Sequence, residues 1–288
     1  MRTAANWLDY ELLDADAGER LERWGDYTLI RPDPQIVWTS RRRGADWGKT
    51  DAVYIRSRSG GGAWEYRSKL PESWNVSYKG LTFKIKPTGF KHTGLFPEQA
   101  VNWDLCADLI SGAGREISLL NLFAYTGGAT LACLEAGASV CHIDAVKPMV
   151  GWAKENAALS GLSGKPVRWI TDDAVKFLNR EIRRGNRYDA VILDPPSYGR
   201  GTGGEMWKFG DSIDSLMRKC AEVLSEKPLF VMMNGYAAGL SAGAAAYLLN
   251  AAFGSGFKVA VEADEIGLPV KSSGLTLPCG CTAVARFL

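Results

Sequence analysis

From about Asn121 onward, short apolar runs alternate with segments whose apolar residues recur at helical spacing. The runs predict buried strands and the longer segments predict helices. The predicted strands are ISLLNLF, SVCHID, PVRWI, YDAVILD and PLFVMM, and the predicted helices are GATLACLEAG, KPMVGWAKENAALSGL, DAVKFLNREIRRG, SIDSLMRKCAEVLS and AGAAAYLLNAAFG. This alternation predicts an α/β fold with an open parallel sheet, helices on both faces and a ligand at the carboxyl ends of the strands.

Residues 1–100 show a different pattern. Turns such as RPDP and SGGGAW separate short alternating segments such as LTFKIKPTG, which predicts a small, mostly antiparallel β lobe. We therefore expect a β-rich lobe over residues 1–100 and an α/β domain over residues 101–288.

The lobe also combines basic and aromatic residues. Between Arg31 and Lys91 there are thirteen Lys/Arg and five Asp/Glu residues. The interleaved rings are those of Trp38, Trp47, Tyr54, Trp64, Tyr66, Trp74 and Tyr78. Cations that meet phosphates and rings that stack on bases are typical of an RNA-binding surface. A solvated face over a small aromatic core explains the pattern equally well, because the whole chain has a net charge of only +2.

Composition limits the remaining classes. The 288 residues are 46% hydrophobic and 23% charged, as in folded globular proteins. We expect a cytoplasmic protein with no membrane partner, because no signal peptide or membrane-length apolar stretch is present. Six cysteines without a CxxC spacing, beside two histidines, predict free thiols and no metal site.

The stretch LLNLFAYTGGATLACLEAGASVCHIDAVKP carries the strongest ligand signal. A strand leads through a glycine-containing turn into a helix, and the next strand ends at Asp144, whose carboxylate suits two ribose hydroxyls. Thr126, Gly127 and Gly128 would let a ligand approach the backbone closely. Alternatively, the glycines form only a tight turn and Asp144 caps the following helix. The similarly placed stretches RWITDDA and LDPPSY favour the ligand.

A nicotinamide dinucleotide is the competing ligand. The GxGxxG fingerprint is missing, because residues 123–126 fill the turn where glycines would clear a pyrophosphate. An adenosine ligand without a pyrophosphate fits better.

The stretch AVILDPPSYGR places two prolines at the end of a predicted strand. Proline lacks an N–H and pushes the preceding residue into an extended conformation. We therefore expect open carbonyls at Asp194, Pro195 and Pro196, able to accept hydrogen bonds from an exocyclic amine. Tyr198 would offer its ring face to a base.

Together, NLFAYTGGATLACLEAGA, HIDAVKPMVGWAKENAALSGL, DDAVKFL and LDPPSYGRG resemble motifs of class I S-adenosylmethionine-dependent methyltransferases. With FKHTGLFPEQ upstream, residues 80–288 resemble the ribosomal RNA large-subunit methyltransferase family more narrowly. The resemblance implies a Rossmann-like sheet and S-adenosyl-L-methionine as the cofactor.

The resemblance also implies residue roles. The turn from Phe123 to Gly128 would contact the methionine part, Asp144 the ribose, and Asp173 with Ala174 the adenine edge. HTGLFPEQ would fold over the cofactor from the other side, unless it is only a linker between the lobes. The implied cofactor-binding residues are Thr93, Phe96, Gln99, Asn121, Phe123, Ala124, Tyr125, Thr126, Gly127, Gly128, Asp144, Ala145, Asp173, Ala174 and Asp194.

The catalytic and substrate residues cluster around two strand ends. The expected catalytic residues are Asp194, Pro195, Pro196 and Tyr198, and the expected substrate residues are Ser197, Arg200, Asn234 and Tyr236. Ser197 intervenes where amino-methylating enzymes usually place the aromatic residue, so the target atom stays open among base amine, ring nitrogen, ring carbon and ribose.

A cysteine nucleophile is not expected. The stretches FVMMNGYAAG and DPPSYG contain no cysteine, and Cys279 and Cys281 in LPCGCTA suit packing better than catalysis. Asn234 and Tyr236 lie after the fifth strand, where a cysteine nucleophile would otherwise be expected. Nearby, glycines 199, 201, 203, 204 and 210 surround Arg200 and Trp207 in either a substrate lid or a plain surface loop.

These features favour a methyltransferase acting on ribosomal or other RNA. The alternatives are a methyltransferase for small molecules or proteins, and a non-catalytic RNA-binding protein. The intact Asp144, Asp173 and Asp194 argue against the last. Because the lobe begins almost at Met1, substrate recognition is expected from the lobe itself or from a homo-oligomer.

Overall fold

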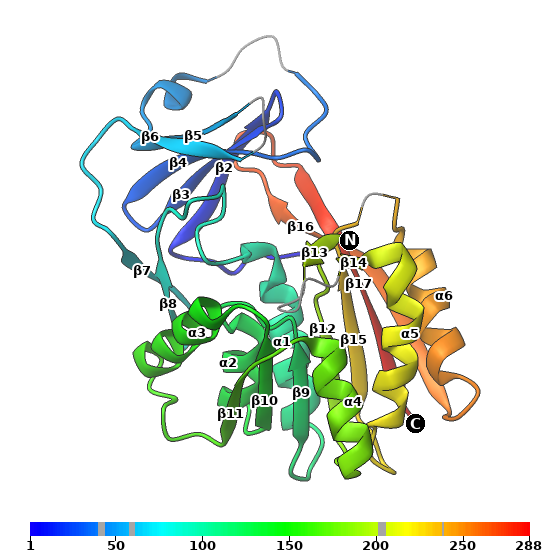
Figure 1. Cartoon of the computed structure of the whole chain (residues 1–288). Coiled ribbons are helices and arrows are strands. Elements are labelled where there is room, and N and C mark those ends of the chain that lie inside the picture. The colour runs from blue at the N-terminus through cyan, green and yellow to red at the C-terminus, as the bar shows by residue number, and fades with distance from the viewer. Residues whose placement is uncertain (40–43, 58–60, 201–205, 238) are drawn as a thin grey trace. The chain divides into compact units, whose positions relative to one another are not determined.

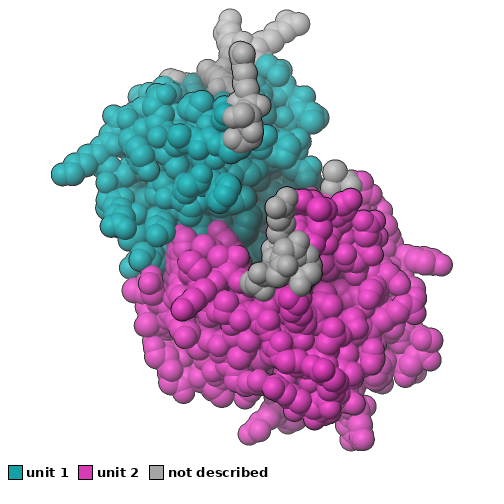
Figure 2. Space-filling view, in the orientation of Figure 1, with its two compact units in different colours: residues 1–100, 267–279 teal, residues 101–266, 280–288 magenta. Residues whose placement is uncertain are grey.

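The computed structural model describes residues 1–39, 44–57, 61–200, 206–237 and 239–288. The chain divides into two compact units, which Figure 2 shows in different colours: unit 1 holds Met1–Ala100 and Gly267–Cys279, and unit 2 holds Val101–Ile266 and Gly280–Leu288.

The segment Gly267–Cys279 differs from the sequence-based division, which placed it in the second domain. The main-chain N–H groups of Lys271 and Ser272 donate to the carbonyls of Leu12 and Leu13, at 2.9 and 3.0 Å. These main-chain bonds tie the segment to unit 1. No local sequence pattern marks such a return, because the pairing joins residues far apart in the chain.

An open mixed sheet of eight strands runs in the order β1-β16-β17-β15-β12-β9-β10-β11 (Figure 1). Its strands are β1 (Arg2–Thr3), β9 (Ser118–Leu122), β10 (Ser139–Asp144), β11 (Val167–Thr171), β12 (Ala190–Leu193), β15 (Phe230–Gly235), β16 (Val259–Pro269) and β17 (Thr276–Phe287). The five strands β15, β12, β9, β10 and β11 pair in parallel, and β17 pairs antiparallel with β15. The five predicted parallel strands and the Rossmann-like fold class are confirmed.

Six helices connect these strands in the described part of the chain: α1 (Ala100–Ser111), α2 (Gly128–Glu135), α3 (Lys147–Leu159), α4 (Ala174–Arg184), α5 (Phe209–Glu222) and α6 (Ala242–Phe253). Figure 1 shows α4, α5 and α6 on one face of the sheet. Their apolar residues bury one continuous core with alternate residues of β9, β10, β12, β15 and β17. This single packed face holds the carboxyl ends of the strands in fixed register.

Local signals explain where several helices begin and end. The Asp173 carboxylate accepts from the Lys176 N–H and caps α4, and the Ser241 hydroxyl caps α6 in the same way. Gly185 ends α4 with a φ of 71°, a left-handed conformation that costs glycine little. The capping residues therefore lie at the boundaries that the sequence pattern predicts.

Unit 1 contains a five-stranded sheet in the order β2-β3-β4-β5-β6 and a hairpin of β7 and β8. Its strands are β2 (Tyr10–Asp16), β3 (Glu19–Trp24), β4 (Tyr27–Pro32), β5 (Ala52–Arg56), β6 (Gly62–Tyr66), β7 (Trp74–Tyr78) and β8 (Leu81–Ile85), with short 3-10 helices η1 (Ala45–Gly48) and η2 (Pro97–Gln99). All described pairs are antiparallel except β4 with β5, so the predicted mostly antiparallel lobe is confirmed.

Several aromatic residues of unit 1 form its core. Trp47, Tyr54 and Tyr78 are buried, and the Tyr10 ring lies 4.6 Å from that of Trp24. A buried ring cannot stack on a base. For these residues the aromatic-core interpretation holds, whereas Trp38 and Tyr66 are exposed.

Two further features bear on composition. All six cysteines are buried free thiols. Among the described residues, no helix combines the length and the apolar character needed to cross a membrane.

Candidate functional site

Acidic residues follow three parallel strands at one edge of the sheet in unit 2. Ile143 and Leu193 both pair in register with Leu122, so Asp144 and Asp194 follow at the same edge. The Asp172 N–H donates to the Asp144 carbonyl at 3.0 Å. The structure thus brings the predicted carboxylates to the carboxyl edge, where parallel sheets bind ligands.

The turn after β9 has an unusual backbone. Phe123, Tyr125 and Gly127 have φ values of 58°, 49° and 90°, all in the left-handed region. This region costs a non-glycine residue about 1–2 kcal/mol, and such strain is concentrated at ligand sites. Both the strained backbone of this turn and its position at the carboxyl edge therefore indicate a binding site.

Hydrogen bonds from neighbouring elements hold this turn in place. The Ala124 N–H donates to the Ile143 carbonyl at 3.0 Å. From α3, the Asn156 side-chain amide donates to the Thr126 carbonyl at 2.9 Å. Asn156 is fully buried and was not singled out from the sequence, because an asparagine inside a helix carries no local signal.

The Asp144 carboxylate holds the neighbouring backbone in place and can still bind a ligand. Its Oδ2 accepts from the Tyr125 N–H and its Oδ1 from the Val146 N–H, both at 2.8 Å. Each carboxylate oxygen can accept another hydrogen bond, so the group can also receive two ribose hydroxyls. Burial raises the pKa of Asp144, and the two backbone hydrogen bonds oppose that rise. The half-buried Ala145 follows directly.

Asp173 and Ala174 form the start of α4. The Asp173 Oδ1 accepts from the Lys176 N–H at 2.9 Å, and Ala174 is buried. Asp172 forms an ion pair with Arg180 and accepts from the Asp173 N–H at 2.9 Å. An adenine contact through Asp173 would therefore use a carboxylate that already caps the helix.

Two further implied cofactor residues, Gly128 and Asn121, also have described contacts inside unit 2. A Cβ on Gly128 would lie 2.5 Å from the Trp103 ring, so close packing of α1 on α2 accounts for this glycine. Asn121 is buried, and its amide donates to the Thr130 hydroxyl at 2.9 Å, which in turn contacts His142. These contacts stabilise the helix that follows the turn.

The Asp194-Pro-Pro turn differs from the expected row of open carbonyls. The Trp207 Nε1 donates to the Pro196 carbonyl at 2.6 Å, so that carbonyl already has a donor. The indole belongs to β14 (Met206–Lys208), and the Pro196 carbonyl keeps a second lone pair, so its expected role toward an exocyclic amine stays a prediction. Asp194 is half-buried, Pro195 is buried, and Tyr198 is exposed.

The loop after β12 is partly described. Tyr198–Arg200 forms β13 and pairs antiparallel with β14, in the register Tyr198↔Lys208 and Gly199↔Trp207. Ser197 is exposed beside it. The side chain of Arg200 and the expected lid glycines 201, 203 and 204 lie outside the described residues, so the lid remains a prediction.

Asn234 is buried and forms hydrogen bonds with two other side chains of unit 2. It is 3% exposed, and its Oδ1 accepts from the Asn102 amide at 3.0 Å and the Thr282 hydroxyl at 2.9 Å. Its side chain lies within a buried hydrogen-bond network of unit 2, and the substrate role expected for Asn234 stays a prediction. Tyr236 is half-buried and packs against Gly280.

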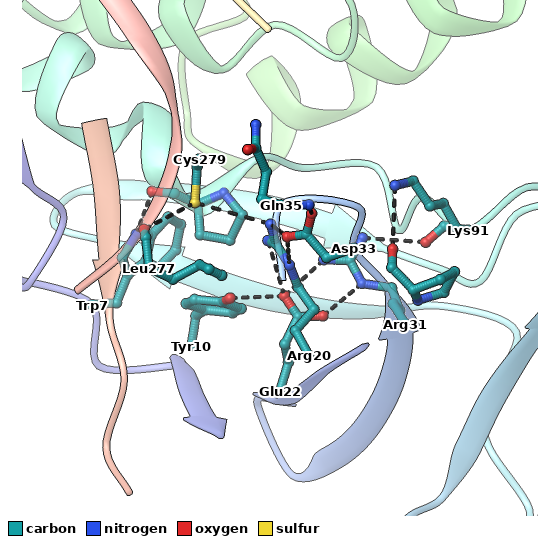
Figure 3. Close-up of polar contacts among 12 residues, drawn as sticks. Trp7, Tyr10, Arg20, Glu22, Arg31, Asp33, Gln35, Lys91, Leu277 and Cys279 are labelled. Carbon is teal, nitrogen blue, oxygen red and sulfur yellow. Dashed lines mark hydrogen bonds and ion pairs between the residues drawn. The ribbon is translucent and has the colours of Figure 1, made fainter. Parts of the chain in front are cut away.

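The segment 91–99 of unit 1 is anchored at both ends. Arg31 Nη1 donates to the Lys91 carbonyl and Lys91 Nζ to the Pro32 carbonyl, both at 3.2 Å. At the other end, Trp7 Nε1 donates to the Pro97 carbonyl at 3.0 Å (Figure 3). These contacts hold the segment firmly within unit 1. A loose linker would not need such contacts.

Thr93 and Gln99 are buried and Phe96 is half-buried in that segment. Within the described chain, the Thr93 hydroxyl has no hydrogen-bond partner. A buried hydroxyl without a partner is costly, which fits a group that meets a ligand. Glu98 Oε2 is likewise buried without a hydrogen-bond partner in the described chain, and burial raises the pKa of its carboxyl. Sequence reasoning missed Glu98 within the FPEQ motif.

A buried charged cluster supports this segment (Figure 3). Glu22 accepts from Arg31 Nε at 2.6 Å and from the Tyr10 hydroxyl at 2.7 Å, and Arg20 Nε donates to Asp33 at 2.8 Å. Burial alone would raise the pKa of Glu22, but Arg31, Arg20 and the Tyr10 hydroxyl together outweigh it and lower that pKa. The cluster thereby fixes the Arg31 side chain that holds Lys91.

Comparison with known proteins agrees with this architecture. A family model described as S-adenosylmethionine-dependent methyltransferase matches residues 17–248. The ribosomal RNA large subunit methyltransferase K/L of Shewanella frigidimarina (strain NCIMB 400) is 33% identical over 211 residues, which cover 66% of this chain and 28% of that protein. The protein of the same name from Pseudoalteromonas atlantica (strain T6c / ATCC BAA-1087) is 34% identical over 216 residues, covering 66% and 29%. The chain thus spans less than a third of the length of these relatives.

A solved structure matches nearly the whole chain. The SAM-dependent methyltransferase from Agrobacterium tumefaciens is 36% identical with a TM-score of 0.91, covering 99% of this chain and 92% of that chain. The predicted enzyme class and the S-adenosyl-L-methionine cofactor are confirmed by these matches. The protein that carries Asp144 and Asp194 at its sheet edge belongs to the family of S-adenosylmethionine-dependent methyltransferases.

Proposed function

We propose that this methyltransferase modifies RNA, with ribosomal RNA as its substrate. The carrying observation is the similarity, at 33–34% identity over 66% of the chain, to relatives named ribosomal RNA large subunit methyltransferase K/L. The chain covers less than a third of the length of those relatives, so their substrate is proposed for this chain and not carried over directly. We also propose a cytoplasmic location, where RNA is available.

The cofactor roles assigned to unit 2 follow from the carboxyl edge. S-adenosyl-L-methionine supplies an activated methyl group. Asp144 binds the ribose hydroxyls through the lone pairs that its two backbone hydrogen bonds leave over. The turn Phe123–Gly128 lies against the methionine part, and Asp173 with Ala174 lies at the adenine edge. In unit 1, Thr93, Phe96 and Gln99 provide further cofactor contacts.

The catalytic role of the protein is alignment. Holding a nucleophile in line with an activated methyl group can supply about 7–11 kcal/mol. Asp194 and the Pro195 carbonyl orient the target, while Trp207 fixes the Pro196 carbonyl and so stiffens the turn. The exposed Tyr198 ring is available to stack on a base.

The proposed reaction uses no cysteine nucleophile. Burial raises the pKa of both Cys279 and Cys281, so that neither forms a thiolate readily. Methyl transfer then goes directly to the RNA atom that the site holds in line.

The test is methyl transfer from labelled S-adenosylmethionine to deproteinised large-subunit ribosomal RNA. RNA from a strain that lacks the gene should accept label, and RNA from the parent strain should accept little because its target is already methylated. Asp194→Ala should abolish the incorporation, whereas the exposed Asp214→Ala serves as the matched control. Equal labelling of both RNA samples, or none of either, would contradict the proposed substrate.

A further inference from the structure

A basic groove runs between α4 and α5 on the surface of unit 2. It has a volume of about 590 Å³ and is lined by Lys176, Asn179, Arg180, Ile182, Arg183, Lys219 and Glu222. Four lining side chains are cationic and one is a carboxylate. The groove is therefore a positively charged surface.

The helices fix these charges in a row. Lys176, Arg180 and Arg183 are spaced by four and three residues, which places them along one face of α4. Lys219 reaches across from α5, because its Nζ donates to the Asn179 Oδ1 at 2.7 Å. That bond ties the two walls of the groove together without neutralising the ammonium charge.

Arg183 differs from the arginines near it. Arg180 forms an ion pair with Asp172, and Arg184 pairs with Glu181. Arg183 is exposed, and no hydrogen bond or ion pair joins its guanidinium to any other described residue. An arginine that lines a groove in this way is available for bidentate contact with a phosphate.

The groove begins at the carboxyl edge of the sheet. Lys176 lies three residues after Asp173, in the first turn of α4, and Arg183 lies in the last turn. An α-helix rises 1.5 Å per residue, so the 11 residues of α4 extend about 16 Å away from that edge. A polyanion that reaches the edge can thus continue along the helices.

We propose that this groove binds backbone phosphates of the substrate RNA. The proposal rests on the proposed function, since it takes the substrate to be RNA. Cationic side chains on neighbouring helices bind phosphates without reading bases, so they would set the position of the RNA while the carboxyl edge holds the target.

The test measures RNA binding directly and needs no methyl transfer. Fluorescence anisotropy of labelled polyuridylate with the full chain gives the Kd across a salt series. The double variant Arg183→Ala/Lys219→Ala should weaken binding roughly tenfold and lower the slope of log Kd against log salt by about 1.4, since a single-stranded phosphate contact contributes about 0.7. The control Lys165→Ala/Lys258→Ala removes the same charge from exposed sites elsewhere in unit 2 and should change neither quantity.

The outcomes separate the groove from the reaction. Unchanged Kd and salt slope in the double variant, with S-adenosylhomocysteine binding intact, would overturn the groove proposal even where RNA is methylated. Weakened RNA binding beside a wild type that methylates no RNA would support the groove and overturn the proposed function. Competition by poly-L-glutamate as effective as by RNA, lost in the variant, would assign the groove to an acidic protein and overturn the proposal. Arg183→Ala alone tests the same point where Lys219→Ala destabilises the helix pair.

Discussion

The indole Nε1 of Trp207 donates a 2.6 Å hydrogen bond to the Pro196 carbonyl. The same ring lies 5.4 Å from the ring of Phe123. One side chain therefore connects the turn after β12 with the turn after β9. The residues expected at the reacting centre and those expected at the cofactor are held together by this contact.

Trp207→Phe should lower kcat about fivefold while the Kd for S-adenosylhomocysteine stays unchanged. Phenylalanine keeps the ring contact with Phe123 but loses the N–H donor, and a hydrogen bond contributes about 1 kcal/mol. Trp207→Ala loses both contacts and should show the larger defect. Single-turnover methyl transfer and calorimetry measure the two quantities; wild-type kcat in the phenylalanine variant would contradict the proposed stiffening.

Asp144→Ala should weaken S-adenosylhomocysteine binding by at least a hundredfold. The variant loses two charge-assisted hydrogen bonds to the ribose, each contributing about 1.5–3 kcal/mol, and also releases the Tyr125 and Val146 N–H groups. Calorimetric titration gives the Kd, and Asp214→Ala on the exposed face of α5 is the matched control. An affinity within a fewfold of wild type would remove Asp144 from the ribose contact.

The affinity should also fall on acidification at a higher pH than an ordinary aspartate would cause. Burial raises the pKa of Asp144, and protonation removes the charge that the hydroxyls bind. Titrations over a pH series from neutral to acidic, with the protein still folded, show this decline.

Cys279→Ser and Cys281→Ser should both keep methyl transfer within about twofold of wild type. Each thiol is buried, and burial raises its pKa, so neither supplies a thiolate nucleophile at neutral pH. Rates are measured with labelled S-adenosylmethionine on the accepted RNA. Abolished turnover in a variant that still binds S-adenosylhomocysteine would establish covalent catalysis instead.

Gly128→Ala should destabilise the protein by about 1–3 kcal/mol, because the new Cβ would lie 2.5 Å from the Trp103 ring. Gly151→Ala is the matched control on α3, where nothing lies within 4 Å of the added Cβ. Alanine in an open helix position should stabilise by about 0.5–1 kcal/mol. Urea unfolding measures both. Equal effects of the two changes would show that Trp103 moves aside at little cost.

The sequence predicted what depends on local pattern. Apolar runs ending in Asp144 and Asp194 had to be buried strands, and parallel pairing then brought both carboxylates to one edge. The Asp173 cap also follows from its position before the apolar pattern of α4. These features require no knowledge of distant contacts.

Contacts between distant residues could not be predicted. Asn234 could be placed at a strand end, but its burial depends on Asn102 and Thr282, which are far away in the chain. In the same way, the glycine loop gave no sign that Trp207 would bond to Pro196. Each of these polar groups resembles a functional residue until its partner is known.

The free energy of unfolding should fall by about 2 kcal/mol between pH 7 and pH 5 through His142 alone. Burial lowers the pKa of His142 to about 3, against 6.5 for an unperturbed histidine, so the unfolded state binds one more proton between these values. Stability therefore rises with pH in this window and is lost on acidification. His142→Gln removes this titration while its amide can still contact Thr130, which lies 2.9 Å from His142 Nδ1. Urea unfolding at both pH values measures the difference, and an equal loss in variant and wild type would show that His142 does not contribute.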